Sequence, residues 1–241
     1  MRHKRIWLSV LIVFIVSAGA LYGLSMHQLR PKPRLPHLPV SPSELENFFG
    51  DSSCSWPCWQ GITPGVTTSD DALQLLQTSP LVSQPTVRSE SSKTGFGITY
   101  WDWKIGDEQP MLTDNMVWRN GIVHTISLTA FPTFSLGGAI DRFGPPDKID
   151  VIDCTEVPEG KYRYLCGTLY YTKSGFEIHI DWQVTWNDMG IQITPSDPIS
   201  FVFLFKPTTI EEWVASYGGD PQTLNLRDWN GYGNLYDLYF R

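Results

Sequence analysis

The fold of this chain is constrained most by a short helical pattern that recurs at residues 61–76, 134–146 and 208–221. A gap-free alignment of the three copies gives four columns of equivalent residues: Thr68, Ser135 and Thr209; Ala72, Ala139 and Trp213; Leu73, Ile140 and Val214; Leu76, Phe143 and Tyr217. The first column supplies a side-chain oxygen that caps a helix, and the other three follow one buried face. Proline, twice with glycine, follows each copy and ends the helix. We therefore expect three structurally equivalent helices.

Runs of β-branched and aromatic residues follow these helical patterns and predict strands. The expected strands are 96–104, 116–128 as a hairpin turning at Asn120-Gly121, 148–154, 162–172, 176–186 and 201–205. Asn120-Gly121 suits a two-residue type I′ turn because both residues tolerate positive φ. The strand at 176–186 alternates strictly between apolar and polar residues, which predicts one buried and one solvated face. A last hairpin is expected about Asn230-Gly231.

The pattern of elements predicts an α+β fold in which an N-terminal transmembrane helix is followed by repeated units. Each unit is expected to be one short helix packed on antiparallel strands. The predicted segments are a signal anchor or signal peptide at 1–26, a Pro-rich spacer at 27–40, a first unit at 41–132, and a second unit with a C-terminal helix and tail at 133–241.

Residues 6–24 form an uncharged, mainly apolar run after the basic start Arg2-His-Lys-Arg5. Such a run is near the length that crosses a bilayer, and it also describes a signal peptide with Ala18-Gly-Ala20 as the cleavage site. We favour an uncleaved anchor because apolar residues continue beyond Ala20. The expected location is the cell membrane, single-pass with the C-terminal domain extracytoplasmic, or secreted if the segment is cleaved.

The charge of the chain is unevenly distributed and argues against nucleic-acid binding. Residues 1–34 hold six Lys/Arg and no Asp or Glu, so the other 12 Lys/Arg and 25 Asp/Glu give residues 35–241 a net charge of −13. An acidic domain repels phosphate backbones, which makes nucleic acid an improbable partner class.

The four cysteines, Cys54, Cys58, Cys154 and Cys166, all follow the apolar N-terminal run. An even number outside the cytoplasm favours disulfides, and four cysteines allow three pairings. Cys154 and Cys166 are equidistant from Gly160, so a hairpin turning there places them opposite each other and leaves Cys54 with Cys58. A metal site is disfavoured because no paired Cys-x-x-Cys or suitably spaced His is present. A redox-active Cys54/Cys58 pair departs from Cys-x-x-Cys by one residue.

Glu177, His179 and Asp181 share one face of the alternating strand and are the candidate polar site. Such a carboxylate–imidazole group suits metal binding or acid–base work, although strand alternation alone already predicts a solvated polar face here. His124 lies among apolar residues of its strand, where a core histidine is favoured over a catalytic base. Trp101 and Trp103 share another strand face, and core packing is favoured over stacking on sugars or partner side chains.

Two short motifs carry a resemblance to known envelope proteins. Pro64-Gly65-Val66-Thr67 and Arg142-Phe-Gly-Pro-Pro146 look like the turn into a helix and the helix end of BamE/SmpA-like small envelope proteins and the related β-lactamase-inhibitor fold. Cys58 to Gly65 also resembles a Cys-Trp-x-Gly-Ile-Thr-Pro-Gly stretch of uncharacterised secreted bacterial proteins. The first resemblance implies an envelope protein that acts by binding and brings no catalytic residues.

These features predict a membrane-tethered extracytoplasmic binding or structural protein. The expected partners are the membrane through residues 6–24 and either another envelope protein or a surface glycan. No cofactor, metal site or catalytic motif is identified, so a non-enzyme is favoured. The alternative is an envelope hydrolase or carbohydrate-processing enzyme with a site assembled across the repeats.

Overall fold

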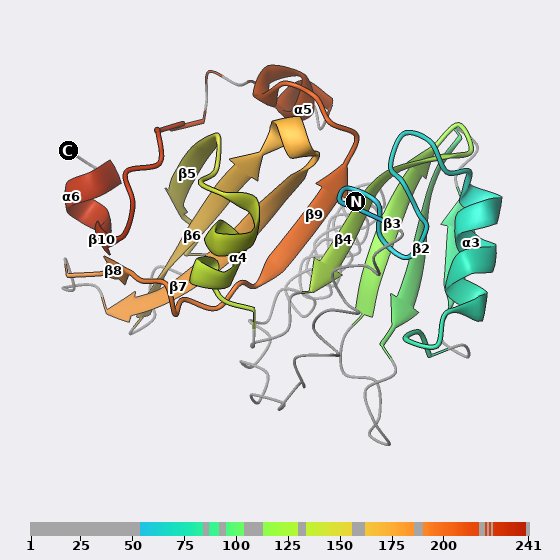
Figure 1. Ribbon diagram of the computed structural model, residues 1–241, viewed down its shortest axis with the longest axis horizontal. Helices are drawn as coiled ribbons and strands as arrows, with labels where there is room; N and C mark the ends of the chain where they lie inside the picture. Colours follow the sequence, from blue (N-terminus) through green and yellow to red (C-terminus); the bar gives the residue numbers. More distant parts are fainter. Residues whose placement is uncertain are drawn as a thin grey trace, which may run out of the picture. The chain divides into compact units, whose positions relative to one another are not determined.

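Alternating sequence segments form one large antiparallel sheet in the computed structural model, which describes residues 54–83, 87–91, 95–103, 113–129, 134–155, 162–185, 190–216, 220, 222 and 224–239. The chain divides into two compact units, Met1–Leu38 and Pro39–Arg241, and every described residue belongs to the second. The sheet contains eight strands in the order β1-β2-β3-β4-β9-β7-β6-β5 (Figure 1).

Seven of the eight strands lie where the sequence predicts strands, and β1 was not predicted. The eight strands are β1 (Arg88–Ser91), β2 (Phe96–Asp102), β3 (Thr113–Arg119), β4 (Ile122–Thr129), β5 (Lys148–Asp153), β6 (Tyr162–Tyr171), β7 (Phe176–Thr185) and β9 (Phe201–Phe205). Asn120 and Gly121 join β3 to β4 with φ of 51° and 76°, as a type I′ turn requires. A short 3-10 turn, η2 (Thr172–Ser174), joins β6 to β7.

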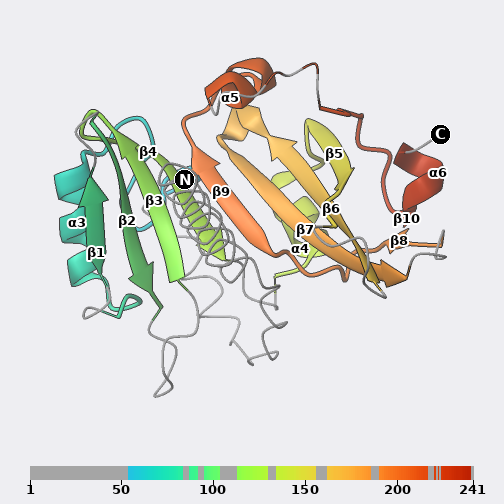
Figure 2. The same ribbon diagram turned by 180° about the vertical axis from the view of Figure 1, so that it is seen from behind.

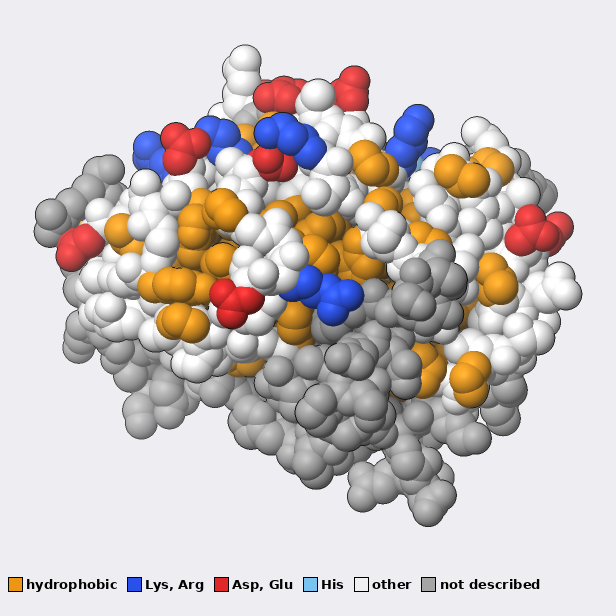
Figure 3. Space-filling view, viewed as in Figure 1, with side chains coloured by type: hydrophobic (Ala, Val, Ile, Leu, Met, Phe, Trp, Pro, Cys, Tyr) orange, Lys and Arg blue, Asp and Glu red, His pale blue; other side chains and the backbone are white. Residues whose placement is uncertain are grey.

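Two helices cover the same side of this sheet, as Figures 1 and 2 show from opposite directions. They are α3 (Ser69–Thr78) and α4 (Leu136–Phe143), and their N-caps Thr68 and Ser135 accept the backbone N–H of Asp71 and Gly138. Charged side chains are few on this side, and most Lys and Arg in view lie along its upper edge (Figure 3). We call the sheet face beneath α3 and α4 the covered face, and the opposite one the polar face.

Aromatic residues fill the covered face. Trp59 is fully buried and stacks on Trp101 at 5.5 Å between ring centroids, while Trp103 meets Trp59 edge-on. Further along the sheet, Phe143 of α4 packs on Phe176 at 4.8 Å. The favoured interpretation of Trp101 and Trp103 as core residues is therefore confirmed.

Two glycines on the covered face leave room for tryptophan rings. A Cβ on Gly97 would lie 2.1 Å from the Trp118 ring, and a Cβ on Gly167 would lie 2.6 Å from the Trp182 ring. Each ring therefore rests on the bare backbone of a neighbouring strand. An alanine at either position would displace the ring.

The predicted fold class is wrong. The structure is mainly one eight-stranded antiparallel sheet with a few short helices, because β4 pairs with β9 and joins the strands of both expected units. No helix of the described part is long and apolar enough to cross a membrane, and residues 6–24 lie outside that part. Local periodicity identifies strands, but it carries no information on which distant strands pair.

The third helix is also not equivalent to the first two. Helix α5 (Ile210–Ser216) is capped by Thr209 as expected, since Glu212 donates its backbone N–H to the Thr209 hydroxyl. However, its Trp213 stacks on Phe205 of the polar face, at 3.5 Å between centroids. The column of Ala72, Ala139 and Trp213 is buried in all three helices, but the alignment did not predict the sheet face of α5. Tyr217 lies outside the described residues.

The C-terminal segment does not form the expected hairpin about Asn230-Gly231. Instead β10 (Gly233–Asn234) pairs with β8 (Gln192–Ile193), and α6 (Leu235–Tyr239) follows. Arg227 exchanges two backbone hydrogen bonds with Ile149 of the edge strand β5, at 2.8 and 2.9 Å. This segment therefore covers part of an otherwise open sheet edge.

Candidate functional site

Four side chains form a line across neighbouring strands on the polar face. Asp150 of β5 lies opposite Thr168 of β6, Thr168 opposite His179 of β7, and His179 opposite Phe201 of β9. Residues directly opposite in an antiparallel pair point to the same sheet face. We call these four residues the polar row.

Exposure changes steadily along the polar row. Phe201 is 38% exposed, the His179 side chain is 26% exposed, and Asp150 is only 5% exposed. The row is thus exposed at Phe201 and buried at Asp150. Leu224 and Leu226 pack against the cluster of Tyr170, Phe205 and Trp213.

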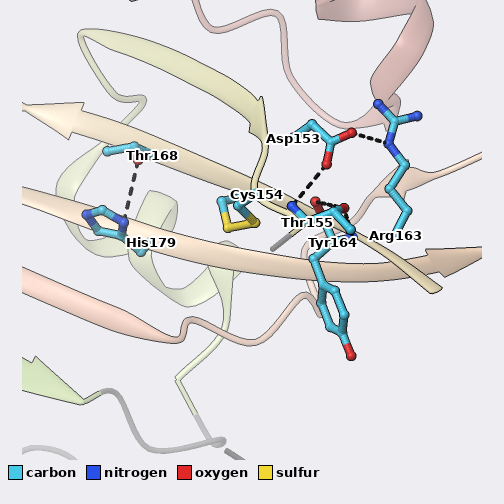
Figure 4. Close-up of a disulfide and its surroundings, with 8 residues drawn as sticks. Asp153, Cys154, Thr155, Arg163, Tyr164, Thr168 and His179 are labelled. Carbon is cyan, nitrogen blue, oxygen red and sulfur yellow. Dashed lines mark hydrogen bonds and ion pairs between the residues drawn. A yellow bond between two sulfur atoms is a disulfide. The ribbon is translucent and has the colours of Figure 1, made fainter. Parts of the chain in front are cut away.

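Glu177 fixes the ring of His179. Glu177 Oε1 lies 2.9 Å from His179 Nε2, and its Oε2 accepts the Trp213 indole N–H at 2.6 Å. The other ring nitrogen, His179 Nδ1, faces the Thr168 hydroxyl at 3.5 Å (Figure 4). Carboxylate, imidazole and hydroxyl are therefore in line, the arrangement that orients a general base.

Helix α5 closes the end of the polar face nearest Glu177. Its Trp213 is 5% exposed and packs with Phe205 and Tyr170. Burial, together with the negative charges of Glu177 and Asp150, raises the pKa of Tyr170. Tyr170 therefore stays a neutral phenol between these carboxyl groups.

Asp150 is the least satisfied member of the polar row. Burial raises the pKa of the Asp150 carboxyl. Hydrogen bonds from the backbone N–H groups of Asn225 and Val151 lower this pKa, but by less than burial raises it. Asp150 Oδ1 is buried and has no hydrogen-bond partner within the part of the chain that the structure describes. A buried carboxyl oxygen without a donor is unusual in folded proteins.

Asp114 shows how a buried aspartate is normally accommodated in this fold. It is 1% exposed and accepts hydrogen bonds from the Trp103 indole and from the backbone and hydroxyl of Thr129, at 2.5, 2.8 and 2.6 Å. Asp114 is therefore a structural carboxylate, whereas one oxygen of Asp150 has no donor among the described residues.

The structure brings together two of the three predicted site residues. Glu177 and His179 are in contact. Asp181 is exposed and lies two residues further along β7, opposite Cys166 of β6. Asp150, Thr168 and Trp213 were missed. Alternation marks the face of Asp150 and Thr168, but their strand partners depend on the fold, and no sequence signal brings Trp213 to this face.

Both predicted disulfides are confirmed. Cys54 pairs with Cys58, and Cys154 pairs with Cys166, with Cα atoms 5.4 and 5.8 Å apart. Figure 4 shows the second bridge between β5 and β6, close to the Arg163–Asp153 ion pair. It closes the hairpin that carries Asp150 and Thr168.

His124 does not contribute to the polar row. Trp118 pairs with Val123 and Val117 with Thr125, so His124 is the extra residue of a β-bulge. Burial and the positive charge of Arg119 lower its pKa. This half-buried position agrees with a histidine that packs within the fold.

No group of three His, Cys, Asp or Glu side chains is placed to hold a metal ion among the described residues. Comparisons with known proteins are also negative. No protein-family model matches the chain, and no curated protein or solved structure is significantly similar to it.

Proposed function

We propose that this chain is a non-catalytic, extracytoplasmic binding protein that recognises a surface glycan through the polar row. The observation that carries the proposal is the line of Phe201, His179, Thr168 and Asp150 on one sheet face. An exposed ring beside fixed polar groups suits a sugar, because one sugar face is apolar and its edge carries hydroxyls.

The support for an extracytoplasmic location is the pair of disulfides, which persist in oxidising compartments. Kinship with BamE/SmpA-like envelope proteins is part of the same proposal. It rests on the turn and helix-end motifs at residues 64–67 and 142–146.

The test compares two phenylalanines of nearly equal exposure on the same sheet face. Phe201 is 38% and Phe96 37% exposed, but only Phe201 belongs to the polar row. The full chain is titrated calorimetrically with neutral chitin, cellulose and xylan oligosaccharides. We expect at least one to bind, with Phe201→Ala weakening it tenfold or more and Phe96→Ala leaving it unchanged. Absence of binding, or equal effects of the two variants, would contradict the proposal.

A hydrolase is the second candidate, favoured by the alignment of Thr168, His179 and Glu177. In that case Thr168 acts as nucleophile, with His179 as the base. The 3.5 Å between Thr168 Oγ1 and His179 Nδ1 is at the outer limit of a hydrogen bond, which favours binding over catalysis. Such a nucleophile attacks an acyl carbonyl, so hydrolysis of a p-nitrophenyl ester by the wild type, abolished in Thr168→Val, would establish the hydrolase instead.

A further inference from the structure

Exposed aromatic side chains gather in the C-terminal segment, away from the polar row. Tyr232 and Tyr236 are the most exposed aromatic residues that the structure describes, at 40% and 44%. Trp229 meets Tyr232 edge-on, with ring centroids 5.7 Å apart. Figure 3 shows hydrophobic side chains at the left of the view, the side on which Figure 1 places this segment. We call Trp229, Tyr232 and Tyr236 the aromatic patch.

The backbone that carries the aromatic patch is fixed to the rest of the fold. Asn230 donates its backbone N–H to the hydroxyl of Tyr239, which is 2% exposed. Leu235 donates its backbone N–H to Ile191 O at 2.8 Å, next to the pairing of β10 with β8. Tyrosine and tryptophan rings that are exposed and held in place are typical of protein-binding surfaces.

Carboxylates lie beside the aromatic patch. Asp228 and Asp237 belong to the same segment and are exposed, although Asp228 also pairs with Lys148 at 2.6 Å. Burial and the negative charge of Asp141 on α4 raise the pKa of Tyr232, so this acid also lies near the patch. Aromatic faces and carboxylates together favour a cationic partner.

The Pro-rich spacer at 27–40, which lies outside the described residues, has the complementary chemistry. It contains no Asp or Glu, and its basic residues are Arg30, Lys32 and Arg34. Pro33, Pro36 and Pro39 recur at every third residue, the period of a polyproline II helix, so that such a helix carries them on one face. Aromatic surfaces bind such proline faces at low entropic cost, because the polyproline helix is already extended.

We infer that the aromatic patch of one copy binds the Pro-rich spacer of a second copy of this chain. Three positive charges of the spacer meet the acidic surroundings of the patch, and its proline face packs on the exposed rings. Because one sequence carries both surfaces, neighbouring copies bring each other's partner. The polar row takes no part in this contact, so the inference is independent of the proposed glycan binding.

The experiment is carbodiimide coupling of carboxylates to amines in full chains bound to neutral phospholipid vesicles. Equal amounts of chain labelled with the light and the heavy nitrogen isotope are mixed, and Lys32 is the single lysine of the spacer. We expect cross-links that join Lys32 of one isotope to Asp228 or Asp237 of the other. Tyr232→Ala should lower their yield at least fivefold. Phe96→Ala removes a ring of similar exposure on β2 and should leave the yield unchanged.

Each outcome decides the inference. Cross-links confined to one isotope would show that the spacer docks on its own chain and would overturn the assignment to a second copy. Absence of the cross-link in the wild type, or an equal yield in a Tyr232→Ala variant whose fold is checked by circular dichroism, would exclude the aromatic patch. Replacing Pro33, Pro36 and Pro39 together by alanine changes no residue of the sheet and keeps Lys32. An undiminished yield in that variant would overturn recognition of a polyproline helix.

Discussion

Three tryptophans hold carboxylates through their indole N–H groups. Trp103 donates to Asp114, Trp182 to Asp197 and Trp213 to Glu177, at 2.5, 2.9 and 2.6 Å. Each of these pairs satisfies an indole donor and a carboxylate acceptor together. Asp150 stands outside this scheme, and its titration should therefore be visible in the stability of the fold.

Asp150→Asn should raise the free energy of unfolding by about 1 kcal/mol at neutral pH, because a buried, incompletely bonded carboxylate is removed. Asp114→Asn is the matched control and should lower it by about 1–3 kcal/mol, because it disturbs a fully bonded group. Urea denaturation of the full-length variants measures both. A destabilised Asp150→Asn would show that this carboxylate supports the fold.

The pH dependence of the Asp150→Asn effect has a definite sign. Burial raises the folded-state pKa of Asp150, so the folded chain holds this proton more tightly than the unfolded chain. Its stabilising contribution is complete below the unfolded pKa of about 3.9 and is lost as the pH rises through the folded pKa. The free energy of unfolding of Asp150→Asn should therefore exceed that of the wild type only above about pH 4. If the stability difference between variant and wild type were constant from acid to neutral pH, the buried Asp150 carboxylate would not be its cause.

At the scale of elements, α4 shows how few residues define a short helix. Ser135 accepts the Gly138 N–H at 3.2 Å, and the Gly144 N–H bonds to Ile140 O at the other end. Gly137 approaches Pro195 so closely that a Cβ would lie 2.8 Å from the proline Cβ. Capping at both ends and the close approach of Gly137 to Pro195 together fix the position of α4.

Ser135→Ala should lower the free energy of unfolding by about 1 kcal/mol, because the N-terminal N–H groups of α4 lose their acceptor. Ser135→Asp keeps an acceptor and should stay close to the wild type. Chemical denaturation monitored by circular dichroism distinguishes the two. Equal losses in both variants would point to crowding at this position.

The β5–β6 hairpin is closed by the disulfide between Cys154 and Cys166, 12 residues apart. Replacing both cysteines by serine should lower the free energy of unfolding by about 2–3 kcal/mol, because the unfolded chain gains freedom. The same change at Cys54 and Cys58, only four residues apart, should have a smaller effect. Thermal melts of the two double variants under oxidising conditions provide the comparison, and the reverse order would refute the loop-length explanation.

At the scale of the whole molecule, one strand pair joins the two halves of the eight-stranded sheet. Thr125 to Thr129 of β4 pair with Phe201 to Phe205 of β9, more than seventy residues later in the sequence. The polar row depends on this assembly, because its exposed end is on β9 and its buried end on β5.

The sequence predicted local features better than distant ones. Alternation located β7, Asn120-Gly121 located the β3–β4 hairpin, and equal distances from Gly160 paired Cys154 with Cys166. Each of these features depends on neighbours within one segment. The β4–β9 pairing, the sheet face of α5 and the position of Asp150 depend on long-range contacts. A single sequence does not encode such contacts as a pattern.

Ligand recognition along the polar row can be located by an NMR chemical-shift map of the full chain with neutral chitin, cellulose and xylan oligosaccharides. We expect the perturbed amides to cluster around Asp150, Thr168, His179 and Phe201. Amides of α3, α4 and the β1–β3 strands should be unaffected. Perturbations concentrated on the covered face, or none at saturating oligosaccharide, would show that the polar row is not the binding site.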